Sequence, residues 1–221
     1  MARLARLVLA GHSHLVLQRG HSGRQVFADA IDRSQYLTAV HASAAAEGLQ
    51  VHALALLDNE VLLLVTPMQA SALGRFMQSV GRRYVSAYNR RHRRTGTLWD
   101  GRFRCAVVEP GSTRLDALRL VDGRSQDAGL TSAAHRTGAV RDAALVDPPE
   151  YWQLGNTPFE REAVWRAMLA AGLPLPRTEL LLRAASGGWA AGSDVFAAQV
   201  AADTGRPARP RPRGRPAHKP I

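Results

Sequence analysis

The fold is decided by a stretch of fifteen residues that reads Val51-His52-Ala53-Leu54-Ala55-Leu56-Leu57-Asp58-Asn59-Glu60-Val61-Leu62-Leu63-Leu64-Val65. Its two apolar runs, 51–57 and 60–65, have the length and composition of β-strands. The dipeptide Asp58-Asn59 between them favours a two-residue turn. Thr66-Pro67 ends the second run. The stretch therefore predicts a β-hairpin.

An amphipathic helix is expected on each side of this hairpin. Residues 29–46 have apolar side chains at helical spacing, with Asp29 as the N-cap and Gly48 at the end. Residues 70–91 carry a second apolar stripe, opposite a face rich in arginine. This stripe consists of Leu73, Phe76, Met77, Val80, Tyr84 and Tyr88.

Further elements extend this pattern in both directions. Before the first helix, 4–9 and 13–17 are predicted as one extended segment interrupted by Gly11, and 102–108 is a short strand after the second helix. The resulting order is β-α-β-β-α-β, which predicts an α+β fold with a ferredoxin-like core, an antiparallel sheet with two helices. Another helix is predicted at residues 113–121.

The composition changes after about residue 138. Helices are predicted at 160–171, 178–185 and 194–202, and the remainder is rich in proline and arginine. We expect a ferredoxin-like domain at 1–135, a helical C-terminal region at 136–204 and a disordered basic tail at 205–221.

Positive charge is concentrated in two segments of this 221-residue chain, whose net charge is +11. Residues 75–104 hold nine arginines and one acidic residue, Asp100, and residues 206–221 hold six cations and no acid. Arginine forms bidentate bonds with phosphate and stacks on bases, so two such segments favour nucleic acid as the partner. The alternative is a solvated surface in an arginine-rich protein.

Several classes of protein are excluded by the composition. Cys105 is the single cysteine, so the chain has no internal disulfide framework and no multi-cysteine zinc site. We interpret it as a core residue. No apolar run reaches the length of a membrane span, so no membrane partner is expected. These features predict a cytoplasmic protein, and the expected nucleic-acid partner would associate it with the nucleoid.

One run is specific enough to suggest a family: Arg94-Thr95-Gly96-Thr97-Leu98-Trp99-Asp100-Gly101-Arg102-Phe103. It resembles the most recognisable stretch of the REP-associated tyrosine transposases, which are relatives of the HUH single-strand transposases. Weaker similarities to this family occur at 13–20, 25–33, 81–91, 188–196 and 213–216. The resemblance implies a DNA partner, either a hairpin or a single strand, and leaves a homodimer open.

Members of that family hold a divalent metal, Mg²⁺ or Mn²⁺, with a His-hydrophobic-His pair, and a helix-borne tyrosine attacks the DNA phosphate. The resemblance places the metal ligands at Glu60 and Leu62 and the nucleophile at Leu120. Glutamate can bind a hard cation, but leucine can neither bind metal nor attack phosphate. His14 is either a residual ligand beside Glu60 or, as we favour, a strand histidine that is hydrogen-bonded locally.

The predicted DNA contacts lie in the two basic segments. They are Arg82, Arg83, Arg90, Arg91, Arg93, Arg94, Trp99, Arg102, Arg213 and Arg215. Trp99 either stacks on a base or anchors its loop. Arg213-Gly214-Arg215-Pro216 matches an AT-hook core, and the alternative is a tail that binds phosphate non-specifically.

The sequence thus predicts a DNA-binding protein of the transposase family that has lost catalytic residues and needs no cofactor. The first alternative is an active metal-dependent single-strand endonuclease that uses Glu60, His14 and an unconventional tyrosine such as Tyr84 or Tyr88. The second is an RNA-binding module, because a ferredoxin-like sheet is also the scaffold of the RNA-recognition motif.

Overall fold

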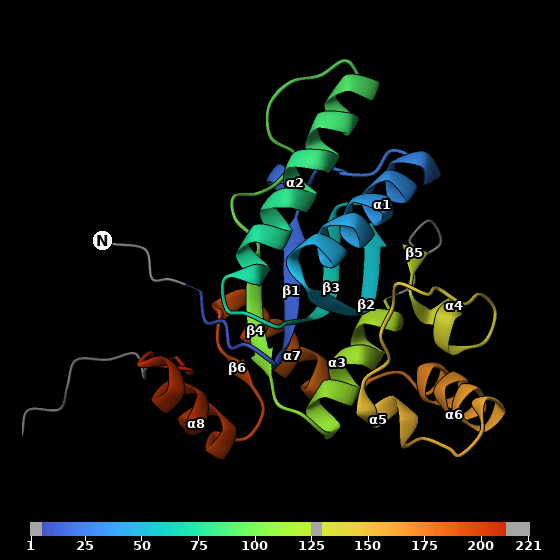
Figure 1. Cartoon of the computed structure of the whole chain (residues 1–221), viewed down its shortest axis with the longest axis vertical. Helices are drawn as coiled ribbons and strands as arrows, with labels where there is room; N and C mark the ends of the chain where they lie inside the picture. Colours follow the sequence, from blue (N-terminus) through green and yellow to red (C-terminus); the bar gives the residue numbers. More distant parts are fainter. Residues whose placement is uncertain (1–5, 125–129, 211–221) are drawn as a thin grey trace, which may run out of the picture.

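The computed structural model describes residues 6–124 and 130–210, which form a mixed α+β structure (Figure 1). Within this part of the chain, six strands make one sheet in the order β5-β2-β3-β1-β4-β6. Their bounds are β1 (Ser13–Arg19), β2 (Leu49–Leu57), β3 (Glu60–Pro67), β4 (Arg104–Val108), β5 (Leu130–Thr131) and β6 (Ala190–Ala191). Neighbouring strands are antiparallel, except that β6 runs parallel to β4. The predicted α+β class is confirmed.

Two helices cover one face of this sheet, α1 (Ala30–Glu47) and α2 (Ala72–Arg91). The Asp29 side chain accepts hydrogen bonds from the backbone N–H groups of Ile31 and Asp32, which confirms it as the N-cap of α1. Gly48 ends the helix in the left-handed conformation, with φ of 60°. The apolar stripe of α2 packs against alternate residues of the central strands, among them Val16 and Leu63.

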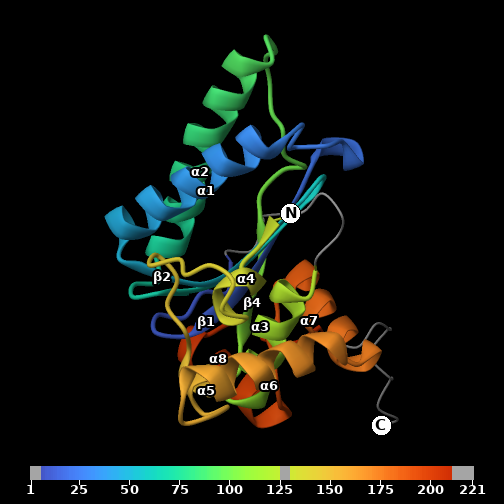
Figure 2. The same ribbon diagram turned by 90° about the vertical axis from the view of Figure 1, so that its right-hand side faces the viewer.

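The second face of the sheet is covered as well, mainly by α3 (Ser112–Asp122) and α7 (Leu175–Gly187). Outside these lie α4 (Ala133–Arg136), α5 (Pro149–Trp152) and α6 (Pro158–Ala170), while α8 (Asp194–Thr204) lies beside β6. Figure 2 shows α1 and α2 on one side of the sheet and α3, α6 and α7 on the other. The segment 136–204 therefore completes the sheet and covers one face of it.

The strong local patterns were predicted well, and the weaker ones were not. The elements β1, α1, β2, β3, α2, β4 and α3 follow one another in the predicted order. The expected extended segment at 4–9 is wrong for its described residues, because β1 begins only at Ser13. The sequence analysis missed β5, β6, α4 and α5, which have two to four residues each.

The beginning of the predicted disordered tail is ordered. The backbone N–H of Ala190 donates to the carbonyl of Ala208, and Ala208 is buried against Leu7, Val107 and Val200. Arg209 also forms an ion pair with Asp194 at 2.8 Å. The prediction of disorder from residue 205 is therefore wrong for 205–210, and residues 211–221 lie outside the described part. No helix in the described ranges has both the length and the apolar character of a membrane span.

A fully buried arginine, Arg136, links the elements that cover the second face of the sheet. The Arg136 guanidinium lies 3.0 Å from Asp122 of α3 and 2.8 Å from Asp147, and it also donates to the carbonyl of His52 in β2. Trp165 of α6 donates its indole N–H to the same Asp122 carboxylate at 3.1 Å. The charge of Arg136 thus compensates two acids that lie in different segments.

We expect Arg136→Ala to lower the free energy of unfolding by about 3–5 kcal/mol, because it leaves Asp122 without its buried countercharge. Urea denaturation followed by circular dichroism measures this loss. The matched control is Arg183→Ala, which breaks the exposed ion pair with Glu179 on α7. It should cost about 0.5 kcal/mol or less. Equal losses in the two variants would contradict the structural role of Arg136.

Candidate nucleic-acid interface

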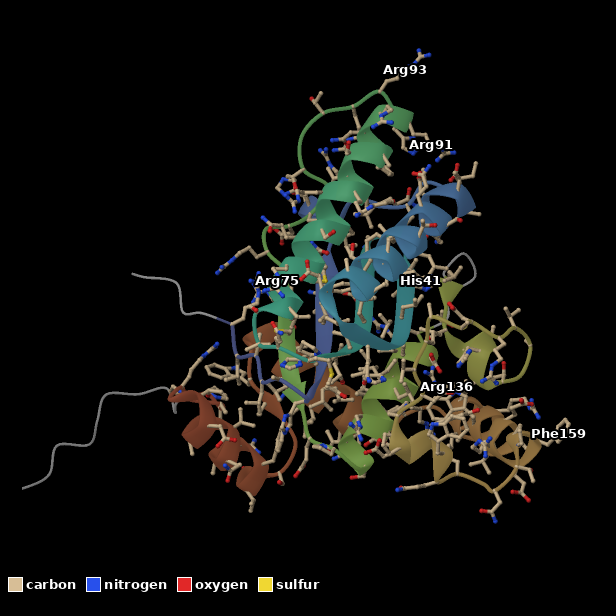
Figure 3. The ribbon with its side chains drawn as sticks, in the orientation of Figure 1. His41, Arg75, Arg91, Arg93, Arg136 and Phe159 are labelled. Carbon is tan, nitrogen blue, oxygen red and sulfur yellow. The ribbon has the colours of Figure 1, made fainter. Side chains whose placement is uncertain are left out.

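The exposed side of α2 carries unpaired arginines. Arg82, Arg83, Arg90 and, just after the helix, Arg93 are exposed, and none forms an ion pair with a described residue. We call these four residues the basic face of α2. They lie opposite the buried stripe because apolar and charged positions alternate with the helical period. In Figure 3, Arg75 lies near the first turn of the helix and Arg93 lies beyond its last turn.

Arg91 has a different role from these neighbours. Its guanidinium donates to Asp29 at 2.5 Å and to the buried Asp32 at 2.6 Å. The hydrogen bond from Arg91 is the main cause that lowers the pKa of the Asp29 carboxyl to about 2. These bonds fasten the end of α2 to the start of α1. Carboxylates of the chain thus compensate the charge of Arg91, so it is not part of the basic face of α2, and the DNA contact expected at Arg91 stays a prediction.

Two further predicted contacts turn toward the protein. Arg94 is half-buried, with its guanidinium 5.7 Å from the ring centre of Tyr88 and a hydrogen bond to the carbonyl of Thr97. Trp99 is only 5% exposed and packs in the core near Tyr36 and Tyr84. Of the two roles considered for Trp99, this burial agrees with the second, in which the indole anchors the segment that connects α2 to β4.

A basic groove lies where the ends of β1 and α7 meet the start of β4. Two adjoining cavities of about 260 and 480 Å³ share Asp100, Arg102, Arg104 and Ser186. The groove is lined by five arginines, Arg6, Arg19, Arg102, Arg104 and Arg206, and by one acid, Asp100. Of these arginines, only Arg102 was predicted as a site residue. Arg6, Arg19 and Arg206 were missed because they are far from Arg102 in the sequence and only the fold brings them together, whereas Arg104 lies in the predicted basic segment 75–104 but was not chosen as a contact.

Arg6 shows how crowded the positive charge in this groove is. Its guanidinium lies 3.7 Å from the ring centre of Phe103 and donates to the Phe103 carbonyl. Burial lowers the pKa of Arg6, and the nearby charge of Arg102 lowers it further. A bound anion would relieve this repulsion.

The predicted nucleophile position holds only hydrocarbon. Leu120 is 5% exposed and belongs to the same apolar cluster as Leu62, between α3 and the sheet. Tyr84, weighed as a substitute nucleophile, is buried among the helices on the other face, where its hydroxyl donates to the carbonyl of Val26. Burial raises the pKa of Tyr84 well above its ordinary value. Tyr88 also belongs to the core.

The predicted metal-ligand position is occupied by an ion-pair cluster. Glu60 accepts a hydrogen bond at each carboxylate oxygen, from Arg19 at 2.7 Å and from Arg124 at 2.7 Å. Leu62 offers no ligand atom. Among residues 6–124 and 130–210, no group of three His, Cys, Asp or Glu side chains could hold a metal ion. The residues at this position therefore do not fit the divalent metal that the resemblance implies.

His14 lies far from Glu60. In the β1–β3 register His14 pairs with Val65 and Arg19 pairs with Glu60. The two side chains are thus five residues apart, about 17 Å along the strand, on opposite faces of the sheet. The His14 ring donates through Nδ1 to the carbonyl of His12 at 2.8 Å and accepts the backbone N–H of Leu9 at 3.2 Å. The local hydrogen-bonding alternative is confirmed, and His14 and Glu60 do not share an ion.

Arg213 and Arg215 lie outside the described residues, so the AT-hook at this site stays a prediction. The domain boundary after residue 135 also stays a prediction.

Comparison with known proteins gives similarity in structure only. No family model matches the chain, and no curated protein matches it. One similar solved structure is a REP-associated tyrosine transposase bound to a REP hairpin, with a TM-score of 0.47 and 10% identity over 64% of this chain and 77% of that chain. Another is a candidate transposase from Deinococcus radiodurans, with a TM-score of 0.38 and 19% identity over 49% of this chain and 88% of that one.

The buried histidines predict how stability depends on pH. Burial is the main cause that lowers the pKa of His14 and of His52 from 6.5 to about 4. Between these pH values the unfolded chain binds protons that the folded protein excludes, so stability falls as the pH drops from 6.5 to 4. His14→Gln should reduce this slope by up to about 1.4 kcal/mol per pH unit. Urea denaturation across this pH range measures the slope, and an unchanged slope would contradict the prediction.

Proposed function

We propose that the chain is a DNA-binding protein related to the REP-associated tyrosine transposases, with a ferredoxin-like core, and that it binds a DNA hairpin or single strand without cutting it. The observation that carries the proposal is the concentration of arginines on α2 and in the basic groove, where Asp100 is the one acidic lining residue. The basic face of α2 leads through the segment 92–103 into the basic groove at the start of β4. The same segment contains the residues that most resemble the family.

This arrangement has the dimensions of a nucleic-acid backbone. From Arg82 to Arg90 the basic face extends about 12 Å, since an α-helix rises about 1.5 Å per residue, and Arg93 follows just after the helix. Duplex DNA carries one charge per about 1.7 Å of axis, so each exposed arginine has phosphates within reach. The basic groove, which is lined by five arginines, is available to a single strand.

Binding without cleavage is supported by the chemistry of the catalytic positions. Leu120 and Leu62 have no nucleophilic or metal-binding atom, and both oxygens of Glu60 are engaged by arginines. Strand cleavage of the family type needs an activated nucleophile and a means of neutralising the phosphate charge. No observation favours the alternative of an active endonuclease.

The RNA-binding alternative is disfavoured by the covered sheet. RNA-recognition motifs stack bases on aromatic side chains of an open sheet face. Here α1 and α2 cover one face, and α3 and α7 cover the other. A homodimer and a nucleoid-associated location stay predictions of the resemblance.

The basic face of α2 is tested by the triple variant Arg82→Ala/Arg90→Ala/Arg93→Ala. We expect its affinity for a DNA hairpin to fall by about tenfold or more, because three phosphate contacts are lost. The slope of log K against log salt concentration should become shallower by about three. Fluorescence anisotropy at a series of salt concentrations measures both quantities.

The control for this experiment removes the same charge elsewhere. Arg141→Ala/Arg166→Ala/Arg183→Ala alters three exposed arginines on the α4–α7 side of the molecule and should leave the affinity almost unchanged. Equal weakening in the two triple variants would indicate a net-charge effect and contradict a defined interface. Metal-dependent nicking of the hairpin by the wild-type protein would contradict binding without cleavage.

A further inference from the structure

Two arginines share one carboxylate at the position where the resemblance places a metal ligand. Arg19 is the last residue of β1, Glu60 is the first residue of β3, and Arg124 follows α3. Each arginine lies 2.7 Å from a different oxygen of Glu60. The Glu60 side chain is 9% exposed, whereas Arg19 is 60% exposed and Arg124 is 34% exposed. The Glu60 carboxylate is thus buried beneath two partly accessible cations. We call Arg19 and Arg124 the arginine pair.

Each guanidinium retains donors after it has bound Glu60. A guanidinium has five N–H groups in a planar fork that matches the oxygens of phosphate. Arg19 uses its Nε for Glu60, so its two terminal nitrogens remain on the exposed side. Arg124 uses Nη2, and its buried Nε has no hydrogen-bond partner in the described part of the chain. Together the two side chains have several donors that an anion could engage.

The surroundings of the pair favour an anion. The cavity of about 260 Å³ beside Arg19 is also lined by Arg102 and Arg104, and Asp100 is its one acidic lining residue. Leu17 and Arg104 are register partners on β1 and β4, and Arg19 lies two residues beyond Leu17. Arg19 and Arg104 therefore face the same side of the sheet as Glu60. Arginines from two separate segments thus line this space, and Arg124 lines a second cavity of about 210 Å³ on its own side of Glu60.

We propose that Arg19 and Arg124 bind a backbone phosphate of DNA directly. Glu60 is a positioning residue that holds the two guanidinium groups together, one at each of its carboxylate oxygens. The proposal rests on the proposed DNA-binding function and adds a phosphate site to it. Because guanidinium is permanently charged, binding at this site requires no metal.

The first measurement uses a fluorescein-labelled oligothymidine of about eight nucleotides. We expect Arg19→Ala and Arg124→Ala each to weaken its binding about tenfold, and Arg19→Lys to recover only part of the affinity, because lysine lacks the planar fork. The matched control is Arg177→Ala, which breaks a partly buried ion pair with Asp116 at 2.6 Å, outside the basic groove. Its affinity should equal that of the wild type. Circular dichroism establishes that each variant is folded.

Glu60→Gln separates positioning from simple electrostatics. The substitution removes a negative charge from a site that binds an anion, so charge alone predicts tighter binding. If Glu60 positions the arginines, binding weakens by about threefold in spite of the added positive charge. Tighter binding by Glu60→Gln would overturn the positioning role.

Two further outcomes decide the proposal. Wild-type affinity should be the same in EDTA and in Mg²⁺ at matched ionic strength, and a loss of binding in EDTA would overturn the metal-free site. If the wild type binds and the triple variant of the basic face is weakened, but Arg19→Ala and Arg124→Ala bind normally, this inference alone fails. If the wild type binds no DNA at all, the proposed function fails as well.

Discussion

Burial of the sheet on both faces is the constraint on which the rest of the structure depends. Every residue of β3 is buried, and alternate side chains along it pack against two different helical layers. A strand of this kind is an almost continuous apolar run, since neither side faces water. Charged groups then occur at strand ends, at the sheet edge and on the outer surfaces of helices, or are buried with a partner of opposite charge, as Arg136 is with Asp122. Glu60 is at such a strand end, and the basic groove lies at the start of an outer strand.

The structure divides its arginines between stability and surface charge. Arg136 and Arg91 are each bound to two carboxylates, and they fasten elements that are distant in sequence. The four arginines of the basic face of α2 form no ion pair with any residue of the described ranges. This division explains why a chain with an excess of cations can fold: acids occur where buried or clustered arginines need them and are sparse where a polyanion is proposed to bind.

Two kinds of group occupy the positions that the resemblance assigns to catalysis, namely buried leucines and a glutamate that is bound by two arginines. Leu62 and Leu120 extend the apolar layer between the sheet and α3, so they contribute to folding. Glu60 is enclosed by guanidinium groups, which can neutralise phosphate but supply no activated water or hydroxyl. The proposed phosphate site therefore lies at the end of a strand whose next residues belong to the apolar core.

The sequence by itself determined the hairpin, the Asp29 cap of α1 and the two faces of α2, because these depend on interactions between residues a few positions apart. It also located most of the exposed arginines of the basic face. Only the tertiary structure decided that Arg91 and Trp99 turn inward, that β6 joins β4, and that Arg19 and Arg124 meet at Glu60. These contacts join residues that are 41 and 64 positions apart in the case of Glu60. No local periodicity encodes such contacts, since they depend on how the helical layers pack on the sheet.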